Sequence, residues 1–293
     1  MMPSLDDLKK RIKSVKSTQK ITKAMKMVAA AKLRKAQENA EKGRPYSQKM
    51  QNIILNLTKS ISDIENAPKL LVGTGNDKTH LCVVLTADRG LCGGFNSNIC
   101  KLAKISFKEI LNNGKNLKII TVGSKGYDQI KREYGKYIIK KFSFKDKKQI
   151  TFKEAEIIGK EIINLFNQNE FDKCKLFFNN FKNVITQIPI AQQIIPAEKK
   201  SSDLKNENAM FYEFEPDEDE ILEDLLPKNI STQVFKAFLE NAASEQGSRM
   251  TAMDNATRNA GDLVDKLTIN YNRSRQASIT KELIEIISGA ESL

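Results

Sequence analysis

The residues best placed to do chemistry form a glycine-rich turn over residues 89–94, Arg-Gly-Leu-Cys-Gly-Gly. This turn follows an apolar run and precedes a helical pattern, which is where α/β proteins bind phosphate. It lacks the Gly-x-Gly-x-x-Gly spacing, and Gly-Lys-Ser/Thr occurs nowhere in the chain. A second turn, Gly123 to Gly126, has the same weakness. We therefore expect tight strand-to-helix turns and no nucleotide or other cofactor.

Histidine and cysteine are too few and too scattered to indicate a metal centre or a catalytic nucleophile. The only histidine, His80, has no motif around it, so an activated Ser or Cys has no evident base. None of the cysteines has Cys-x-x-Cys spacing, which disfavours zinc and a disulfide framework: Cys82, Cys92, Cys100 and Cys174. Cys82 is expected to fill a core. Because no disulfide framework is indicated, the reducing cytosol is the expected compartment. The sequence thus predicts no catalytic residue and no metal.

Two long helical tracts flank the middle of the chain, Ser4 to about Asn66 and Pro227 to about Ser288. Each would be about 90 Å long at 1.5 Å per residue, several times the width of a domain. Neither can bury its apolar stripe on the middle segment alone. We expect the two tracts to pair as an antiparallel coiled coil, with both chain ends near the far tip.

The apolar spacing defines the faces expected to meet. In the first tract a heptad pattern begins after a Ser4-x-x-Asp7 helix start and continues less strictly into three alanines: Leu5, Leu8, Ile12, Val15, then Ile21, Met25, Val28. In the second tract the stripe comprises Phe235, Phe238, Ala242, Met253, Ala256, Ala260, Leu263, Leu267, Ile279, Leu283 and Ile286. Gly43 and Pro45 are expected to bend the first helix without ending it. Gly247 and Gly261 should each weaken the second by about 1 kcal/mol unless other surfaces hold it.

The middle segment alternates strand and helix patterns, which predicts a Rossmann-like α/β domain with a mostly parallel five-stranded sheet. Expected strands are Leu81–Thr86, Leu117–Val122, Tyr137–Phe144, Leu176–Phe181 and Ile185–Ile195, the last forming an antiparallel edge. Expected helices are Ile99–Leu111, Tyr127–Tyr134 and Phe152–Phe166. The predicted division is 1–66, a shaft helix; 67–226, a foot domain ending in an acidic linker; and 227–293, a second shaft helix. Pro227 is expected to be its first helical residue.

The charge is distributed unevenly. Residues 1–44 carry ten Lys and three Arg against four acids, a net of +9 out of +12, whereas residues 213–227 carry eight acids and no base. A basic surface of this kind fits nucleic acid, anionic lipid or an acidic protein loop, or is simply a solvated face. The basic residues circle the helix and no aromatic residue precedes Tyr46, so docking inside a protein shell is favoured over nucleic acid.

The apolar runs, such as Leu81–Leu85, are far shorter than a membrane span, and the N-terminus does not have the pattern of a secretory signal. Any association with a membrane is therefore expected to go through a partner.

Four blocks follow one another along almost the whole chain: Lys20-Ile-Thr-Lys-Ala-Met25 with Val28-Ala-Ala-Ala-Lys32; Asp88-Arg-Gly-Leu-Cys-Gly-Gly94; Glu240-Asn-Ala-Ala-Ser-Glu-Gln246 with Arg249-Met250 and Ala252-Met253; and Arg275-Gln-Ala-Ser-Ile-Thr-Lys-Glu282. Together these blocks resemble the gamma subunit of bacterial F-type ATP synthase. The chain departs from the usual pattern at Gly247-Ser248, where helix-favouring small residues are more frequent.

The resemblance implies a non-catalytic rotor, the central stalk that couples proton-driven rotation of the c-ring to conformational cycling of the catalytic beta subunits. The terminal helices would turn inside a ring of three alpha and three beta subunits, and the foot would sit on the epsilon subunit and the c-ring. The expected location is peripheral, on the cytoplasmic face of the bacterial inner membrane, with membrane contact only through the membrane sector. The alternative is a basic coiled-coil nucleic-acid-binding protein.

The resemblance also assigns eight partner-contact residues. Arg275 and Gln276 would hydrogen-bond to a beta-subunit loop near the top of the shaft, with Thr280 and Glu282 in the same region. Met25 would face the acidic loop of beta from the neck. Arg89, Lys101 and Lys104 would form a basic collar toward that loop.

Overall fold

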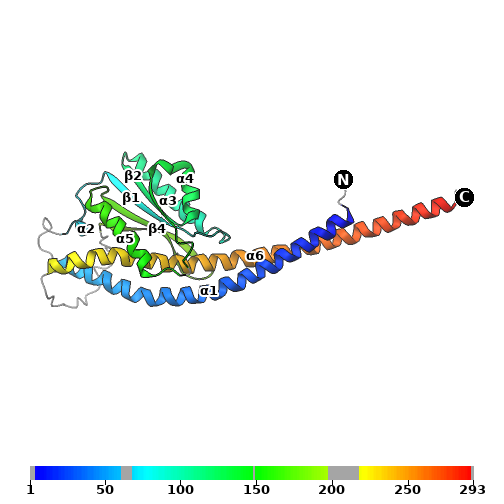
Figure 1. Cartoon of the computed structure of the whole chain (residues 1–293), viewed down its shortest axis with the longest axis horizontal. Helices are drawn as coiled ribbons and strands as arrows, with labels where there is room; N and C mark the ends of the chain where they lie inside the picture. The colour runs from blue at the N-terminus through cyan, green and yellow to red at the C-terminus, as the bar shows by residue number, and fades with distance from the viewer. Residues whose placement is uncertain (1–3, 61–67, 148, 197–217, 292–293) are drawn as a thin grey trace. The chain divides into compact units, whose positions relative to one another are not determined.

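The computed structural model describes residues 4–60, 68–147, 149–196 and 218–291, the side chains of 55–60, 218–220 and 291 excepted. The chain forms two compact units, one of residues 1–30 with 249–293 and one of residues 31–248. The long helices α1 (Leu5–Ser60) and α6 (Glu218–Glu291) each run through both units (Figure 1). The predicted division into three segments stays a prediction.

Helix α1 continues through Gly43 and Pro45, as expected. A proline inside a helix removes one hydrogen bond and costs about 3 kcal/mol, so tertiary packing must hold this stretch. Ala40, Ser47 and Met50 around it are all buried. Close packing on α6 contributes as well, because a Cβ on Gly43 would lie 2.8 Å from Leu239 Cδ1.

The expectation that Pro227 begins the second long helix is wrong. Helix α6 begins at Glu218 and Pro227 lies inside it. Leu222 and Leu226 form a small core with Met50, Ile54 and Leu71, so burial of apolar side chains stabilises the helical turns before the proline. Residues 213–217 of the expected acidic linker lie outside the described residues.

The foot, defined here as residues 68–196 of the second unit, contains a five-stranded sheet in the order β3-β2-β1-β4-β5. The strands are β1 (Thr79–Leu85), β2 (Asn116–Val122), β3 (Ile138–Phe142), β4 (Lys173–Phe181) and β5 (Gln187–Ile195). All neighbours pair in parallel except β4 and β5. The helical elements are α2 (Lys69–Val72), α3 (Phe95–Asn112), α4 (Ser124–Tyr134), η1 (Gly135–Tyr137) and α5 (Phe152–Asn167). The prediction of a mostly parallel sheet with an antiparallel edge is confirmed, although the one-turn helix α2 was expected to be loop.

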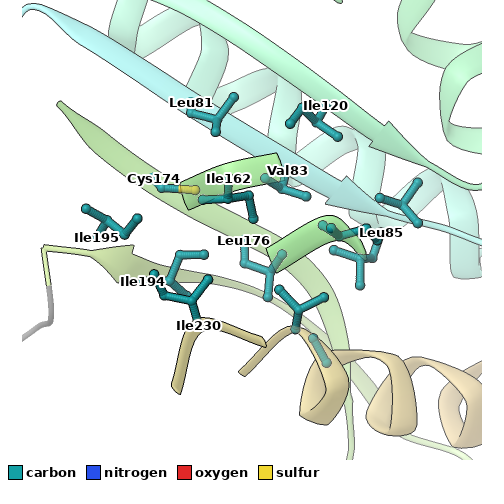
Figure 2. Close-up of a cluster of buried hydrophobic side chains, with 14 of the residues drawn as sticks. Leu81, Val83, Leu85, Ile120, Ile162, Cys174, Leu176, Ile194, Ile195 and Ile230 are labelled. Atoms are coloured by element: carbon teal, nitrogen blue, oxygen red, sulfur yellow. The ribbon is translucent and has the colours of Figure 1, made fainter. Parts of the chain in front are cut away.

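Helices cover both faces of the sheet because side chains alternate along each strand. Cys82, Val84 and Phe177 share one core with α3 and α4. On the other face, Figure 2 shows Leu81, Val83, Leu85 and Leu176 pointing toward Ile162 of α5 and Ile230 of α6. Helix α6 is therefore part of the core of the foot over residues 230–238.

In the first unit α1 and α6 pair antiparallel, which confirms the coiled-coil prediction. Thr22 bonds Thr257 at 2.8 Å, and Lys26 Nζ lies 2.6 Å from Asp254. A Cβ on Gly261 would lie 3.0 Å from Gln19 Nε2. Residue numbers rise on α6 as they fall on α1, and paired numbers add to 279 or 280.

The seam differs from the predicted one at six apolar residues, three of which, Ile279, Leu283 and Ile286, are exposed near the end of α6. Ile21 is 57% exposed and Val28 55% exposed, and Leu263 is exposed as well. A strict heptad instead places buried Leu8, Thr22 and Ala29 with half-buried Val15 on the seam, and on α6 buried Met253, Ala260, Val264 and Leu267. The polar members of this seam are tolerated because they bond across it.

The pairing register also corrects the expected position of the two chain ends. With paired numbers adding to about 280, the start of α1 at Leu5 lies opposite residue 275. Residues 276–290 of α6 therefore extend beyond α1 by about 22 Å at 1.5 Å per residue. We call residues 276–290 the overhang.

Among the helices in the described part of the chain, none has the length and apolar character needed to cross a membrane.

Candidate functional site: partner-contact surfaces

The carboxyl end of the sheet, where an α/β fold would bind phosphate, is occupied by side chains of the chain itself. The Asp88 carboxylate accepts hydrogen bonds from the Ser124 amide at 2.8 Å and the Ser124 hydroxyl at 2.7 Å. It also accepts from the Ser143 hydroxyl at 2.8 Å and the Phe144 amide at 3.0 Å. The Gly126 amide donates to the Thr86 hydroxyl at 2.9 Å. The amides at the start of α4 thus already have acceptors within the chain, and the acceptor of the Ser124 amide is anionic.

This network holds Asp88 ionised. Burial raises the pKa of its carboxyl, but the hydrogen bonds from Ser124, Ser143 and Phe144 outweigh burial and lower the pKa below its usual value. Gly123 is required at the start of α4, because its φ is +96° and a Cβ would lie 2.3 Å from the Thr86 carbonyl oxygen. The turn therefore has a structural role, as the sequence indicated.

The cysteines are all buried. Burial raises the pKa of the Cys82 thiol to about 12 and that of Cys100 to about 11. Neither is a thiolate at neutral pH, so neither is an activated nucleophile.

The three residues expected to form a basic collar lie in the second unit. Arg89 is exposed in the turn after β1, and Lys101 and Lys104 lie one turn apart on α3. Lys104 Nζ lies 2.7 Å from Glu133 of α4, and this hydrogen bond lowers the pKa of the Glu133 carboxyl. Lys104 therefore already has an intramolecular acidic partner, which the sequence did not reveal, whereas the Lys101 side chain is exposed.

The other five expected contact residues lie in the first unit. Met25 is half-buried beside the seam, next to Lys26 and its partner Asp254, whose pKa is lowered by the hydrogen bond from Lys26. At about 100° per residue, Arg275 and Glu282 share one face of α6, and Gln276 and Thr280 share an adjacent face. All four are exposed: Arg275, Gln276, Thr280 and Glu282. The Thr280 hydroxyl donates only within its helix, to the Gln276 carbonyl oxygen at 3.0 Å.

Comparisons with known proteins agree over the whole chain. The family model described as ATP synthase matches residues 4–293. The chain is 73% identical over 292 residues to the ATP synthase gamma chain of Pelagibacter ubique (strain HTCC1062), covering 100% of both chains. It is 58% identical over 295 residues to that of Rhizobium leguminosarum bv. trifolii (strain WSM2304), again covering 100% of both.

The chain belongs to the ATP synthase gamma-chain family.

Solved structures agree with this assignment. A chain from the central stalk and c-ring structure of Tetrahymena thermophila mitochondrial ATP synthase has a TM-score of 0.59 at 30% identity, covering 80% of this chain and 99% of that one. A rotor chain from Euglena gracilis mitochondrial ATP synthase, with a TM-score of 0.64 at 20% identity over 94% and 98% of the two chains, shows the same fold.

Family membership gives the function at the level of the subunit. The chain is a central-stalk rotor subunit and a non-catalytic component of the ATP synthase complex. The alternative of a basic coiled-coil nucleic-acid-binding protein is set aside, because the match includes the foot as well as the basic helix.

Sequence reasoning missed a set of polar α6 residues that contact the foot. The block Glu240 to Gln246 was used only as a mark of resemblance, yet Glu240, Asn241 and Ser244 are buried. The available signal was a run of polar side chains at helical spacing within an otherwise apolar stripe.

Proposed function

We propose that the chain couples rotation of the c-ring to the catalytic cycle by presenting different faces of its two-helix shaft to three beta subunits in turn. The shaft would lie inside a ring of three alpha and three beta subunits, and the foot would contact the epsilon subunit and the c-ring. Such coupling requires contacts that differ between the states of each beta subunit. The solved relatives are described as parts of the central stalk, the rotor and the c-ring assembly, which supports this arrangement.

The observation that carries the proposal is the overhang. Four large apolar side chains on it are all more than half exposed: Leu283, Ile284, Ile286 and Ile287. A helix that is apolar on several sides and lacks a partner helix is stable in water only when another surface covers it. A surrounding sleeve of alpha and beta subunits would provide such a surface.

The overhang also bears three of the four exposed residues assigned to the beta subunit. Gln276, Thr280 and Glu282 lie beyond the start of α1, and Arg275 lies opposite it. A beta-subunit loop can therefore reach them without displacing α1. The basic residues Arg89 and Lys101 would meet the acidic loop of beta, with Met25 in the neck.

We place the chain on the cytoplasmic face of the bacterial inner membrane, held there through the membrane sector of the complex. Its relatives at the highest identities quoted above are bacterial, which supports this location.

The experiment compares two variants of the chain, Arg275→Ala and a truncation after Ser288. Each variant replaces the native gamma subunit in reconstituted complexes. Losing one partner of a desolvated charged hydrogen bond can cost about 2–5 kcal/mol, whereas a frayed helix end makes few contacts. We expect Arg275→Ala to lower ATPase coupled to ion pumping far more than the truncation does. Equal losses would contradict a specific contact at Arg275.

A matched test addresses the collar. Arg89→Gln and Lys101→Gln should each weaken binding of the chain to the catalytic ring more than Lys104→Gln, because Lys104 already pairs with Glu133. Salt should mimic part of the effect, since exposed charges are screened over about 8 Å at physiological ionic strength. Binding that is unchanged in all three variants and insensitive to salt would contradict the collar contact. These residues would then be ordinary solvent-exposed side chains.

A further inference from the structure

Strand β4 extends beyond its parallel neighbour. The β1–β4 pairing ends at Val84 and Phe177, whereas β4 continues to Phe181 paired with β5 alone. Main-chain groups of Asn179 and Phe181 on the β1 side consequently lack a strand partner. Buried main-chain groups need hydrogen bonds, so another element must supply them.

Helix α6 supplies these bonds with side chains. The Asn179 amide donates to Asn241 Oδ1 at 2.8 Å, and the Ser244 hydroxyl donates to the Asn179 carbonyl oxygen at 3.3 Å. Asn241 Nδ2 donates to the Leu85 carbonyl oxygen at the end of β1, at 3.1 Å. Asn241 therefore bridges β1 and β4 where their own ladder has stopped.

The same face of α6 makes two further contacts. The Phe181 amide donates to Glu240 Oε2 at 3.1 Å, and the Ser248 hydroxyl donates to the Cys92 carbonyl oxygen at 2.7 Å. We call Glu240, Asn241, Ser244 and Ser248 the α6 clamp. At 100° per residue these four positions fall within an arc of about 100° on the helix.

Arg44 joins α1 to the clamp. Its guanidinium donates to both carboxylate oxygens of Glu240, at 2.8 and 3.1 Å, and to the Phe181 carbonyl oxygen at 3.2 Å. The Glu240 side chain is only 4% exposed, whereas that of Arg44 is 40% exposed, so the carboxylate of this ion pair is shielded from water and the guanidinium only in part. Both long helices are thereby bonded to the same residue of β4.

The apolar contacts of α6 with the sheet cannot define its orientation in this way. Val234, Ala237 and Phe238 pack into the core of the foot, but burial of apolar surface has no preferred direction. Hydrogen bonds weaken steeply when their angle falls below about 120°, so rotation of α6 about its own axis would break the clamp.

We propose that the members of the α6 clamp are positioning residues for coupling, because they fix the rotation of α6 and α1 relative to the foot within the second unit. This inference rests on the proposed rotor function. Torque applied to the foot would reach α6 through directional bonds at the carboxyl ends of β1 and β4, and α1 through Arg44 and Glu240.

The test uses complexes carrying Asn241→Leu or, as a milder change, Ser244→Ala. ATP hydrolysis and ATP-driven ion pumping are measured per assembled complex. We expect hydrolysis to persist and the ratio of pumping to hydrolysis to fall several-fold in Asn241→Leu and less in Ser244→Ala. Two α6 variants serve as controls: Val234→Ala removes apolar contact with the sheet, and Thr232→Val removes a buried hydroxyl that donates within its helix, to the Lys228 carbonyl oxygen.

Amide hydrogen exchange in the same complexes tests the geometry directly. Asn241→Leu should accelerate exchange of the Asn179 amide at least about tenfold, because its acceptor is lost. The proposal is overturned if the coupling ratio stays at the wild-type value in both clamp variants, or falls equally in Val234→Ala. If Asn241→Leu does not assemble, Ser244→Ala alone decides. Failure of the wild-type chain to restore pumping to complexes lacking the gamma subunit would instead refute the rotor function.

Discussion

Replacing Asp88 by Asn should destabilise the foot, although the two side chains have nearly the same shape. Asp88 accepts four hydrogen bonds, two of them from Ser124 and one each from Ser143 and Phe144. An amide can keep its oxygen toward the serines only by turning its NH₂ toward the Phe144 amide, so one donor then faces another. Hydrogen bonds to a charged group contribute about 1.5–3 kcal/mol each, and Asp88 is half-buried, so we expect a net loss of about 2–3 kcal/mol.

Urea unfolding of the full chain, followed by tyrosine fluorescence, measures this loss. The chain has no tryptophan, and Tyr134 of the foot is buried. With a slope of about 2–3 kcal/mol per molar urea, the midpoint should fall by about 1 M. The matched control is Asp128→Asn on α4, whose carboxylate makes only an exposed pair with Lys125 at 3.6 Å and should change the free energy of unfolding by less than about 0.5 kcal/mol.

The pH dependence gives a second check. Because the pKa of Asp88 is lowered on folding, its contribution to stability is complete above the unfolded pKa of about 3.9 and is lost as the pH falls through the lower folded value. The difference in the free energy of unfolding between wild type and Asp88→Asn should be constant from about pH 5 to 8. It should become smaller below about pH 4. Equal midpoints at pH 7, or a difference that does not narrow in acid, would refute the reasoning.

Three further results are expected. Cysteines at Thr22 and Thr257 should form a disulfide within one chain, because the two hydroxyl oxygens lie 2.8 Å apart; absence of the cross-link under oxidation would contradict the register. Gly159→Ala should destabilise the chain in urea by about 1–3 kcal/mol, since its Cβ would lie 2.3 Å from Ser231 Oγ, and Ser231→Ala should recover part of the loss; additive losses would argue against this contact. Calorimetry with Mg-ATP should show no saturable heat at sub-millimolar concentration. A micromolar site abolished by changing Gly93 would contradict the prediction that the turn at residues 89–94 binds no nucleotide.

The central strands β1 and β2 were predictable because each contains a compact apolar run closed by turn residues. Val83 is buried on the α5 and α6 face of the sheet and Val84 on the α3 and α4 face, as a continuous apolar run in a parallel strand indicates. The antiparallel edge followed from the short connection between β4 and β5. These are local signals, and local signals survive folding when the core agrees with them.

The seam was only partly predictable because seam positions were assigned from apolar character alone. Ile21 and Val28 looked like seam residues, yet Thr22 and Lys26 occupy the seam and bond to α6. Such substitutions of polar for apolar contacts depend on the partner residue, which lies more than 200 positions away in the chain. The start of α6 was missed for a similar reason, since Leu222 is held by residues of α1 and α2.

The candidate contact residues came from family resemblance and remain predictions about partners. What the structure adds is their setting: Lys104 is paired, and Gln276, Thr280 and Glu282 lie on the overhang. The Asp88 network and the α6 clamp could not be derived from the sequence, because each joins segments that meet only in the folded sheet.

The polar pairs in the seam between α1 and α6 affect how the two helices respond to a force along their axis. A seam of leucine and isoleucine alone would accept a slip of one heptad with little change, since one apolar side chain replaces another. A one-heptad slip here would set the Thr22 hydroxyl against Val264 and the Lys26 ammonium against Gly261. Thr22 would keep only its bond to the Gln19 carbonyl oxygen within α1, and Lys26 would lose its acidic partner Asp254. The two helices therefore have one favoured register. A compressive force along the shaft can slide one helix past the other only if it first breaks these polar pairs.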